Sequence, residues 1–196
     1  MNPVAANQSS STSSRADDGV SPHAIGLVCG ALDELLAAVA GIVEDLDDDL
    51  YQTVEREIFR SSPGAHIRHL LDHVRALFEG LETGLICYDR RMRGTAVETD
   101  RECCLVEIEG LRATLAGYQH PDPNRATVFA RRVTVEQIVD PNAAPIRLES
   151  VGLRELVFVF QHSIHHAALL GARLRQAGVP VPEFFGIAPA TLAANR

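Results

Sequence analysis

Residues 153–177 read LRELVFVFQHSIHHAALLGARLRQA, a stretch that is apolar almost all the way round when drawn as a helix. A helix with no polar face is buried on several sides, so this segment is expected at the centre of a helical domain. Ser150 is a suitable N-cap, and Gly178 and Pro180 supply the stop signal. The stretch therefore predicts one long helix that the rest of the chain must cover.

Three other segments predict the helices that cover it. Ser21-Pro22 and Ser62-Pro63 each place an N-cap residue before a proline suited to the first helical turn, and they open helices at 22–46 and 63–83. Thr99 and Glu102 form a capping box at the start of a third helix, which ends near Gly117. Four long helices with one late connection predict an all-α fold, a four-helix bundle.

The remaining segments differ in composition. Residues 127–139, TVFARRVTVEQIV, alternate and are β-branched, so residues 118–149 are expected to hold a short extended or hairpin insert before the last long helix. Residues 1–20 are rich in serine and predict a disordered tail, and residues 21–196 predict a single domain. The proline-rich residues 179–192 are expected to pack across one end of the bundle.

Composition excludes several functions. The 196 residues carry 18 basic and 26 acidic side chains, a net charge of −8, which argues against a nucleic-acid partner. All the basic residues are arginine, and the absence of lysine excludes a Walker phosphate loop and a Schiff-base lysine. With no secretion signal, no run of 18 apolar residues and no C-x-x-C pair, a cytoplasmic protein without a membrane segment is expected.

Six of the eight histidines gather in two short motifs, and these carry most of the functional information. Residues 66–73 read HIRHLLDH and residues 162–166 read HSIHH, so the imidazoles recur at spacings of three, four and seven on predicted helices. His162 and His166 share one face of the last helix, and His69 is central on the other. Two such helices facing each other predict a three-histidine metal site with an open position for water or substrate.

The second motif also invites comparison with H-E-x-x-H, the zinc-protease signature. Position 163 is serine, so the glutamate that would act as the base is missing. A metalloprotease is therefore not expected.

The two motifs together resemble those of the DinB/YfiT-like superfamily, and the likeness spans about residues 21–192. It implies a four-helix bundle and a divalent metal, most often zinc or nickel, held by three histidines. Carried over to this chain, the metal ligands are His69, His162 and His166. His73 and His165 become neighbours that would transfer protons or orient ligands. Some relatives are S-transferases that use a low-molecular-weight thiol, while others have no assigned reaction.

Two functions follow from these observations. The first is a metal-dependent enzyme, a transferase or hydrolase, that acts on a small molecule. The second is a non-catalytic helical module that binds a ligand or forms a homodimer, which an unpaired strand edge within 127–139 would favour. Arg90, Arg91 and Arg93 are either a solvated run or the recognition site for an anionic substrate group.

Overall fold

The computed structural model describes residues 20–54, 60–90, 92–120 and 122–194, so the predicted tail at 1–20 lies almost wholly outside the described residues. The described chain is mostly helical, with a small three-stranded sheet. Its elements, in chain order, are α1 (Pro22–Asp45), α2 (Asp48–Gln52), α3 (Pro63–Thr83), β1 (Leu85–Cys87), η1 (Ala96–Glu98), α4 (Arg101–Gln119), α5 (Pro123–Ala130), β2 (Arg132–Gln137), β3 (Ile146–Val151), α6 (Gly152–Gln176) and α7 (Pro189–Ala194).

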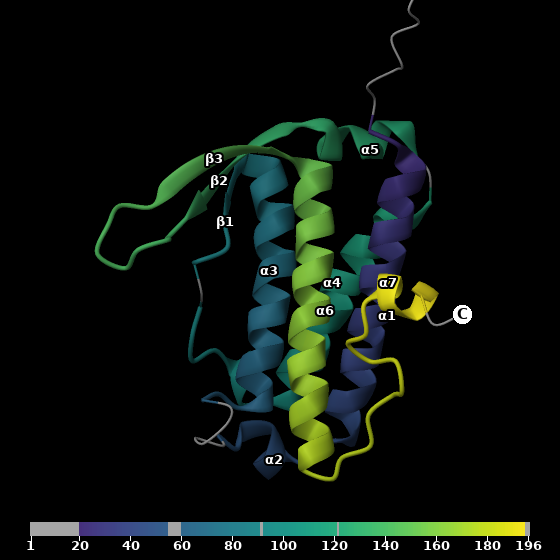
Figure 1. Ribbon diagram of the computed structural model, residues 1–196, viewed down its shortest axis with the longest axis vertical. Coiled ribbons are helices and arrows are strands. Elements are labelled where there is room, and N and C mark those ends of the chain that lie inside the picture. Colours follow the sequence, from purple (N-terminus) through teal and green to yellow (C-terminus); the bar gives the residue numbers. More distant parts are fainter. Residues whose placement is uncertain (1–19, 55–59, 91, 121, 195–196) are drawn as a thin grey trace, which may run out of the picture.

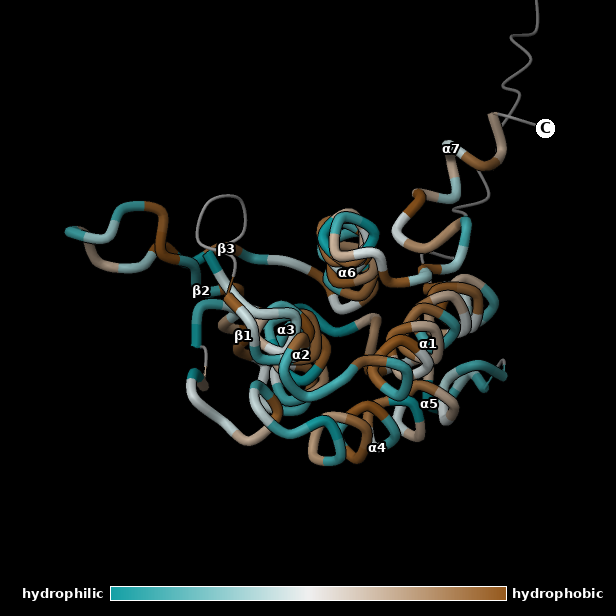
Figure 2. Tube along the Cα trace, turned by 90° about the horizontal axis from the view of Figure 1, so that it is seen from below, coloured by the Kyte–Doolittle hydropathy of each residue, from teal (hydrophilic) through white to brown (hydrophobic). Residues whose placement is uncertain are grey.

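The four long helices pack against one another around a shared core. Helix α1 contacts α4 and α6, while α3 contacts α6 and α4 (Figure 1), and an end-on view shows the four grouped about a common centre (Figure 2). Each helix contributes fully buried aliphatic side chains to this core, among them Leu36, Leu71, Leu115 and Leu156. The fold therefore places α3 and α6, the two histidine-bearing helices, side by side.

The predicted starts of α1 and α3 are confirmed. The side chains of Ser21 and Ser62 accept hydrogen bonds from the backbone N–H groups of Ala24 and Ala65, which satisfies donors that the first helical turn leaves open. Helix α3 ends at Gly84, whose φ of 80° lies in the left-handed region that glycine adopts without strain.

The start of α4 differs from the prediction by one residue. Asp100, and not Thr99, is the N-cap, and its carboxylate accepts hydrogen bonds from the backbone N–H groups of Glu102 and Cys103. An aspartate caps at least as well as a threonine and also carries a favourable charge for the helix N-terminus. The capping-box prediction was therefore wrong in register.

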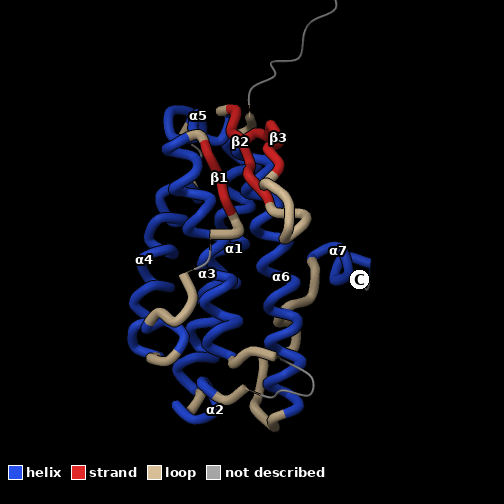
Figure 3. The backbone as a smooth tube through the Cα atoms, turned by 90° about the vertical axis from the view of Figure 1, so that its left-hand side faces the viewer, coloured by secondary structure: helices blue, strands red, loops and turns tan. Residues whose placement is uncertain are grey.

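The hairpin expected within residues 118–149 is present as β2 and β3, which pair antiparallel with Val135 opposite Leu148. Two elements were not predicted: the strand β1, which runs parallel to β2, and the helix α5. The three strands lie together at one end of the helices (Figure 3). Ser150 was predicted to cap the last helix but lies within β3, and α6 begins at Gly152.

Helix α6 is less enclosed than its composition suggests. Its buried stripe includes Leu156, Val159 and Leu170, but a second stripe with Gln161 and His165 is exposed to solvent. The helix packs against α1, α3, α5 and the C-terminal segment, so it is covered on several sides as predicted, but one line of small or polar side chains is exposed. The histidines on its flank lie between these two stripes.

The C-terminal segment was expected to cross one end of the helices, but it runs back alongside α6 and α1 (Figure 1). At Gly186, where φ is 77°, the backbone passes so close to Ala168 that an added Cβ would lie 2.4 Å from its Cα. The glycine thus allows the segment to lie directly on α6.

Within the described residues, α1 is long and apolar enough to cross a membrane by length and composition alone. Its buried side chains, including Leu32 and Val39, pack into the core shared with α4 and α6, as those of an apolar core helix do. The absence of a membrane segment stays a prediction.

Candidate functional site

Histidines from α3 and α6 meet between the two helices. On α3, the spacings of three and four residues turn His66, His69 and His73 toward α6, and His73 is buried while the other two are half-buried. On α6, His162 and His166 lie one turn apart, both half-buried. The two sequence motifs are thus brought together in space.

Four of these rings form a compact group, which we call the four-histidine cluster: His69, His73, His162 and His166. Ring centroids lie 4.1 Å apart for His73 and His162, and 4.5 Å apart for His69 with His73, His69 with His166 and His162 with His166. The two longest separations are 5.7 Å, for His69 and His162, and 6.4 Å, for His73 and His166. Every ring in the cluster is therefore a near neighbour of the other three.

Three members of the cluster could hold a metal ion. One ligand atom from each of His69, His73 and His162 lies within 4.8 Å of the other two. Nδ1 of His73 is 2.9 Å from the backbone carbonyl oxygen of His69, which can only accept a hydrogen bond. The proton of neutral His73 therefore sits on Nδ1, and Nε2 carries the lone pair that a cation needs.

His166 adjoins this group through His162. Their Nε2 atoms are 2.9 Å apart, somewhat closer than the roughly 3.3 Å that tetrahedral geometry gives two nitrogens on one zinc ion. Nδ1 of His166 is buried and has no hydrogen-bond partner among the described residues. Burial lowers the pKa of His166 to about 3, and the neighbouring histidines add to the effect. This ring is therefore neutral at pH 7.

A buried acid lies behind the cluster. Tyr88, in the loop after β1, stacks on His73 with ring centroids 5.2 Å apart, and its hydroxyl donates to the carboxylate of Glu155 at 2.9 Å. Ser150 and Arg154 donate to the other carboxylate oxygen, at 2.5 and 2.7 Å. Burial, reinforced by the charge of Glu155, raises the pKa of Tyr88, so the tyrosine stays protonated. Both carboxylate oxygens of Glu155 thus accept hydrogen bonds, and the bond to Tyr88 holds the ring that covers His73.

The other side of the cluster opens to a cavity of about 490 Å³. His69 and His166 line it together with His66, whose pKa is lowered by burial and by the nearby charge of Arg173. Arginines from the segment before α3 and the loop before η1 also line it. The cluster thus has a protected side, toward Tyr88, and an accessible side, toward this cavity.

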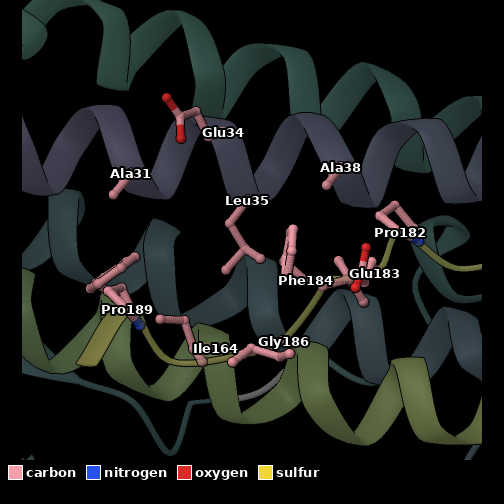
Figure 4. A pocket seen from close by; sticks show the side chains of 13 residues that line it. Ala31, Glu34, Leu35, Ala38, Ile164, Pro182, Glu183, Phe184, Gly186 and Pro189 are labelled. Atoms are coloured by element: carbon pink, nitrogen blue, oxygen red, sulfur yellow. The ribbon is translucent and has the colours of Figure 1, made fainter. Parts of the chain in front are cut away.

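A second cavity, of about 340 Å³, is apolar and lies elsewhere. It is lined by α1, the C-terminal segment and a different face of α6, represented by Leu35, Phe184 and Ile164 (Figure 4). None of the six histidines of the two sequence motifs lines it. It is therefore separate from the site between α3 and α6.

The remaining sequence candidates lie as follows. His165 is on the exposed stripe of α6, with its ring centroid 5.5 Å from that of His166. Arg93 lines the cavity beside the cluster, Arg90 lines a different one, and Arg91 is outside the described residues. Ser163 is buried on the core side of α6, away from the accessible side of the cluster.

Sequence reasoning missed two parts of the site. Tyr88 and Glu155 are 67 positions apart, and nothing in the local sequence signals that they meet. Arg60 stands alone before Ser62-Pro63, so its place beside the histidines depends on how two loops come together.

In comparisons with known proteins, neither a family model nor a curated protein nor a solved structure matches this chain.

Proposed function

We propose that this protein is a metal-dependent enzyme in which His69, His73 and His162 hold one divalent cation within a four-helix bundle. The observation that carries the proposal is the convergence of three imidazoles from two helices, with ligand atoms within 4.8 Å of one another. Three histidine ligands that leave one position open are typical of catalytic zinc sites, whereas structural sites are usually closed by four ligands.

The donor set suits such an ion. Imidazole binds zinc, nickel, copper and iron well, and of these we propose zinc or nickel. Metal-bound histidines usually donate their second ring N–H to a carbonyl or carboxylate, which fixes the ring. His73 has that arrangement through the carbonyl of His69, whereas Nδ1 of His166 has no such partner among the described residues. We therefore propose His73 as the third ligand in place of His166.

The bound cation and the residues around its ligands would have different roles in the reaction. A bound divalent cation would lower the pKa of a coordinated water or thiol and so supply a nucleophile near neutral pH. Tyr88 stacks on the buried ring of His73 and covers it on that side. His166 lines the cavity as a neutral ring, so it can hydrogen-bond to a substrate, while His165 is too exposed to confine one.

The reaction class follows from the resemblance noted above. We propose that the chain is a DinB/YfiT-like protein that catalyses thiol-dependent S-transfer or hydrolysis of a small molecule, with a low-molecular-weight thiol as co-substrate. The cavity beside the cluster, of about 490 Å³, is within the range of small-molecule sites.

Metal analysis tests the proposal directly. Protein purified without chelator is expected to contain about one equivalent of divalent metal by mass spectrometry, and His69→Ala and His162→Ala are expected to lose it. His165→Ala, on the exposed stripe of α6, is the matched control and should retain the metal. If the wild type holds less than a tenth of an equivalent of metal and takes up none on titration, the proposal is wrong.

One observation favours the second function, self-assembly. The hairpin carries exposed apolar side chains, Ile138, Val139, Ile146 and Leu148, and β3 is an edge strand of the sheet. Exposed strand edges with apolar residues pair readily with another chain. We propose a homodimer formed through this hairpin, which is compatible with the metal site because the two lie on different elements.

A further inference from the structure

The cavity beside the four-histidine cluster has an unusual electrostatic lining for a protein of net charge −8. One end is formed by the rings of His66, His69 and His166. The rest of the lining is Arg60, Ser61, Ala65, Arg68, Arg93 and Glu98. Three arginines and one glutamate thus share a cavity with three imidazoles.

The arginines are not equivalent. Arg68 is buried and neutralised, because it pairs with Asp72 and, through Nε at 2.7 Å, with Glu98. Arg60 and Arg93 are exposed and form no ion pair within the described part of the chain. The helices pair arginines with acids elsewhere, as Arg112 pairs with Asp33. Among the described residues, these two arginines therefore bring positive charge to the cavity lining without an ion-pair partner.

The wall that carries Arg93 is held in place by contacts with α2 and α3. The Glu98 carboxylate that pairs with Arg68 also accepts a hydrogen bond from the backbone N–H of Gly94, at 3.0 Å. The hydroxyl of Tyr51 donates to the carbonyl of Val97 at 2.6 Å. These contacts fix η1 and the turn before it, so Arg93 extends from a positioned backbone.

The close approach of η1 to α3 depends on a glycine. A Cβ added at Gly64 would lie 2.3 Å from the carbonyl oxygen of Glu98 and 2.6 Å from the ring of Tyr51. Gly64 therefore lets η1 lie against the first turn of α3, and the first two turns of this helix carry His66 and His69. The turn with Arg93 and the histidines are parts of one tightly packed structure.

From this geometry we infer that the cavity is an anion subsite, which takes the carboxylate or phosphate of a substrate between Arg60 and Arg93. Guanidinium groups match both anions through paired N–H donors. The rest of the substrate would extend along the cavity to the rings of His69 and His166. This inference rests on the proposed function and sharpens it, since it makes the substrate an anionic small molecule and not a neutral or cationic one.

Two thiols that differ only in their charged end test the inference. The protein is loaded with Co²⁺, whose thiolate absorption band reports thiol binding, and is titrated with 3-mercaptopropionate and with 2-mercaptoethanol. The wild type is expected to bind the carboxylate-bearing thiol about tenfold or more tightly, the factor that one charge-assisted hydrogen bond supplies. The double variant R60Q/R93Q is expected to lose this preference while its cobalt content and its affinity for 2-mercaptoethanol stay unchanged.

The double variant R132Q/R147Q is the matched control, because it removes two exposed arginines from the hairpin. It should keep the preference of the wild type. Equal affinity of the wild type for the two thiols would overturn the anion subsite, as would a preference that survives in R60Q/R93Q.

A second measurement separates this inference from the proposed metal site. Metal-free wild type and R60Q/R93Q are titrated with inorganic phosphate by calorimetry. If cobalt fails to bind, the proposed function fails, but phosphate binding that disappears in R60Q/R93Q still supports the anion subsite. If cobalt binds and neither the thiol preference nor phosphate binding depends on the two arginines, only the anion subsite is overturned.

Discussion

Nδ1 of His73 lies 2.9 Å from the carbonyl oxygen of His69, one turn earlier on the same helix. This contact sets the tautomer of His73 and holds its ring between those of Tyr88 and His162. The ring stacks on both, with its centroid 5.2 Å from that of Tyr88 and 4.1 Å from that of His162. A ring held this way loses little rotational freedom when it binds an ion, which favours tight binding. The backbone of α3 thereby prepares a side chain for coordination.

The choice between His73 and His166 as the third ligand can be tested by a matched pair of variants. His73→Ala is expected to weaken zinc binding by roughly a hundredfold or more, since it removes a ligand and its preorganised contact. His166→Ala is expected to change the affinity by about tenfold or less. Competition titrations with a chromophoric chelator measure both. The reverse order of effects would assign the third ligand to His166, as helix spacing alone predicts.

The metal-free protein should show a specific dependence of stability on pH. The pKa of His166 is about 3 in the folded chain, below the ordinary value of 6.5. Between about pH 3 and pH 6.5, His166 therefore binds a proton in the unfolded chain but not in the folded chain. The stability that neutral His166 contributes is therefore complete above pH 6.5 and is lost as the pH falls through this window. Partial exposure keeps the slope below the limit of about 1.4 kcal/mol per pH unit for one proton.

Urea unfolding in the presence of chelator, between pH 6.5 and 4.5, checks this prediction. The free energy of unfolding should fall less steeply for His166→Gln than for the wild type. His165→Gln removes an exposed histidine one residue away and should change the slope less than His166→Gln does. Equal slopes for the wild type and His166→Gln would contradict the assignment.

Tyr88 contributes a ring and a hydroxyl with separable effects. Tyr88→Phe keeps the ring against His73 but removes the donor to Glu155, a fully buried carboxylate. We expect a loss of about 1–3 kcal/mol in the free energy of unfolding and no change in metal content. Tyr88→Leu removes the stacking as well and should also lower metal affinity. A Tyr88→Phe protein as stable as the wild type would show that Ser150 and Arg154 satisfy the acid without help.

Local signals made part of the fold predictable. Ser62, Pro63 and Gly84 mark the ends of α3 because capping and backbone conformation are set within a few residues. The partner of β1 could not be predicted in the same way, since Leu85 pairs with Thr134 and nothing in either segment encodes that distance. The hairpin was predictable because polar and apolar residues alternate along β2. Helix α5 was not predicted, because the β-branched residues near its end were read as part of the same strand.

The site divides along similar lines. Helical periodicity predicted that histidines of two helices share faces, and the structure brings those rings together. Periodicity could not rank His73 against His166, because that depends on side-chain torsions and on the carbonyl of His69. Nor could it place Arg60 and Arg93 on the lining of one cavity, because that depends on how the loop before η1 and the segment before α3 lie against each other.

The hairpin gives the last prediction, on assembly. Leu148 is 49% exposed on the edge strand β3, beside the exposed Ile146, so a charge at this position should disfavour pairing of two copies. We expect the wild type to be a dimer by light scattering and Leu148→Glu to shift it toward monomer with its metal content unchanged. Val106→Glu, at an apolar side chain that is 75% exposed on α4, is the control and should stay dimeric. A monomeric wild type at micromolar concentration would rule out assembly through the hairpin and leave the metal site as the function to pursue.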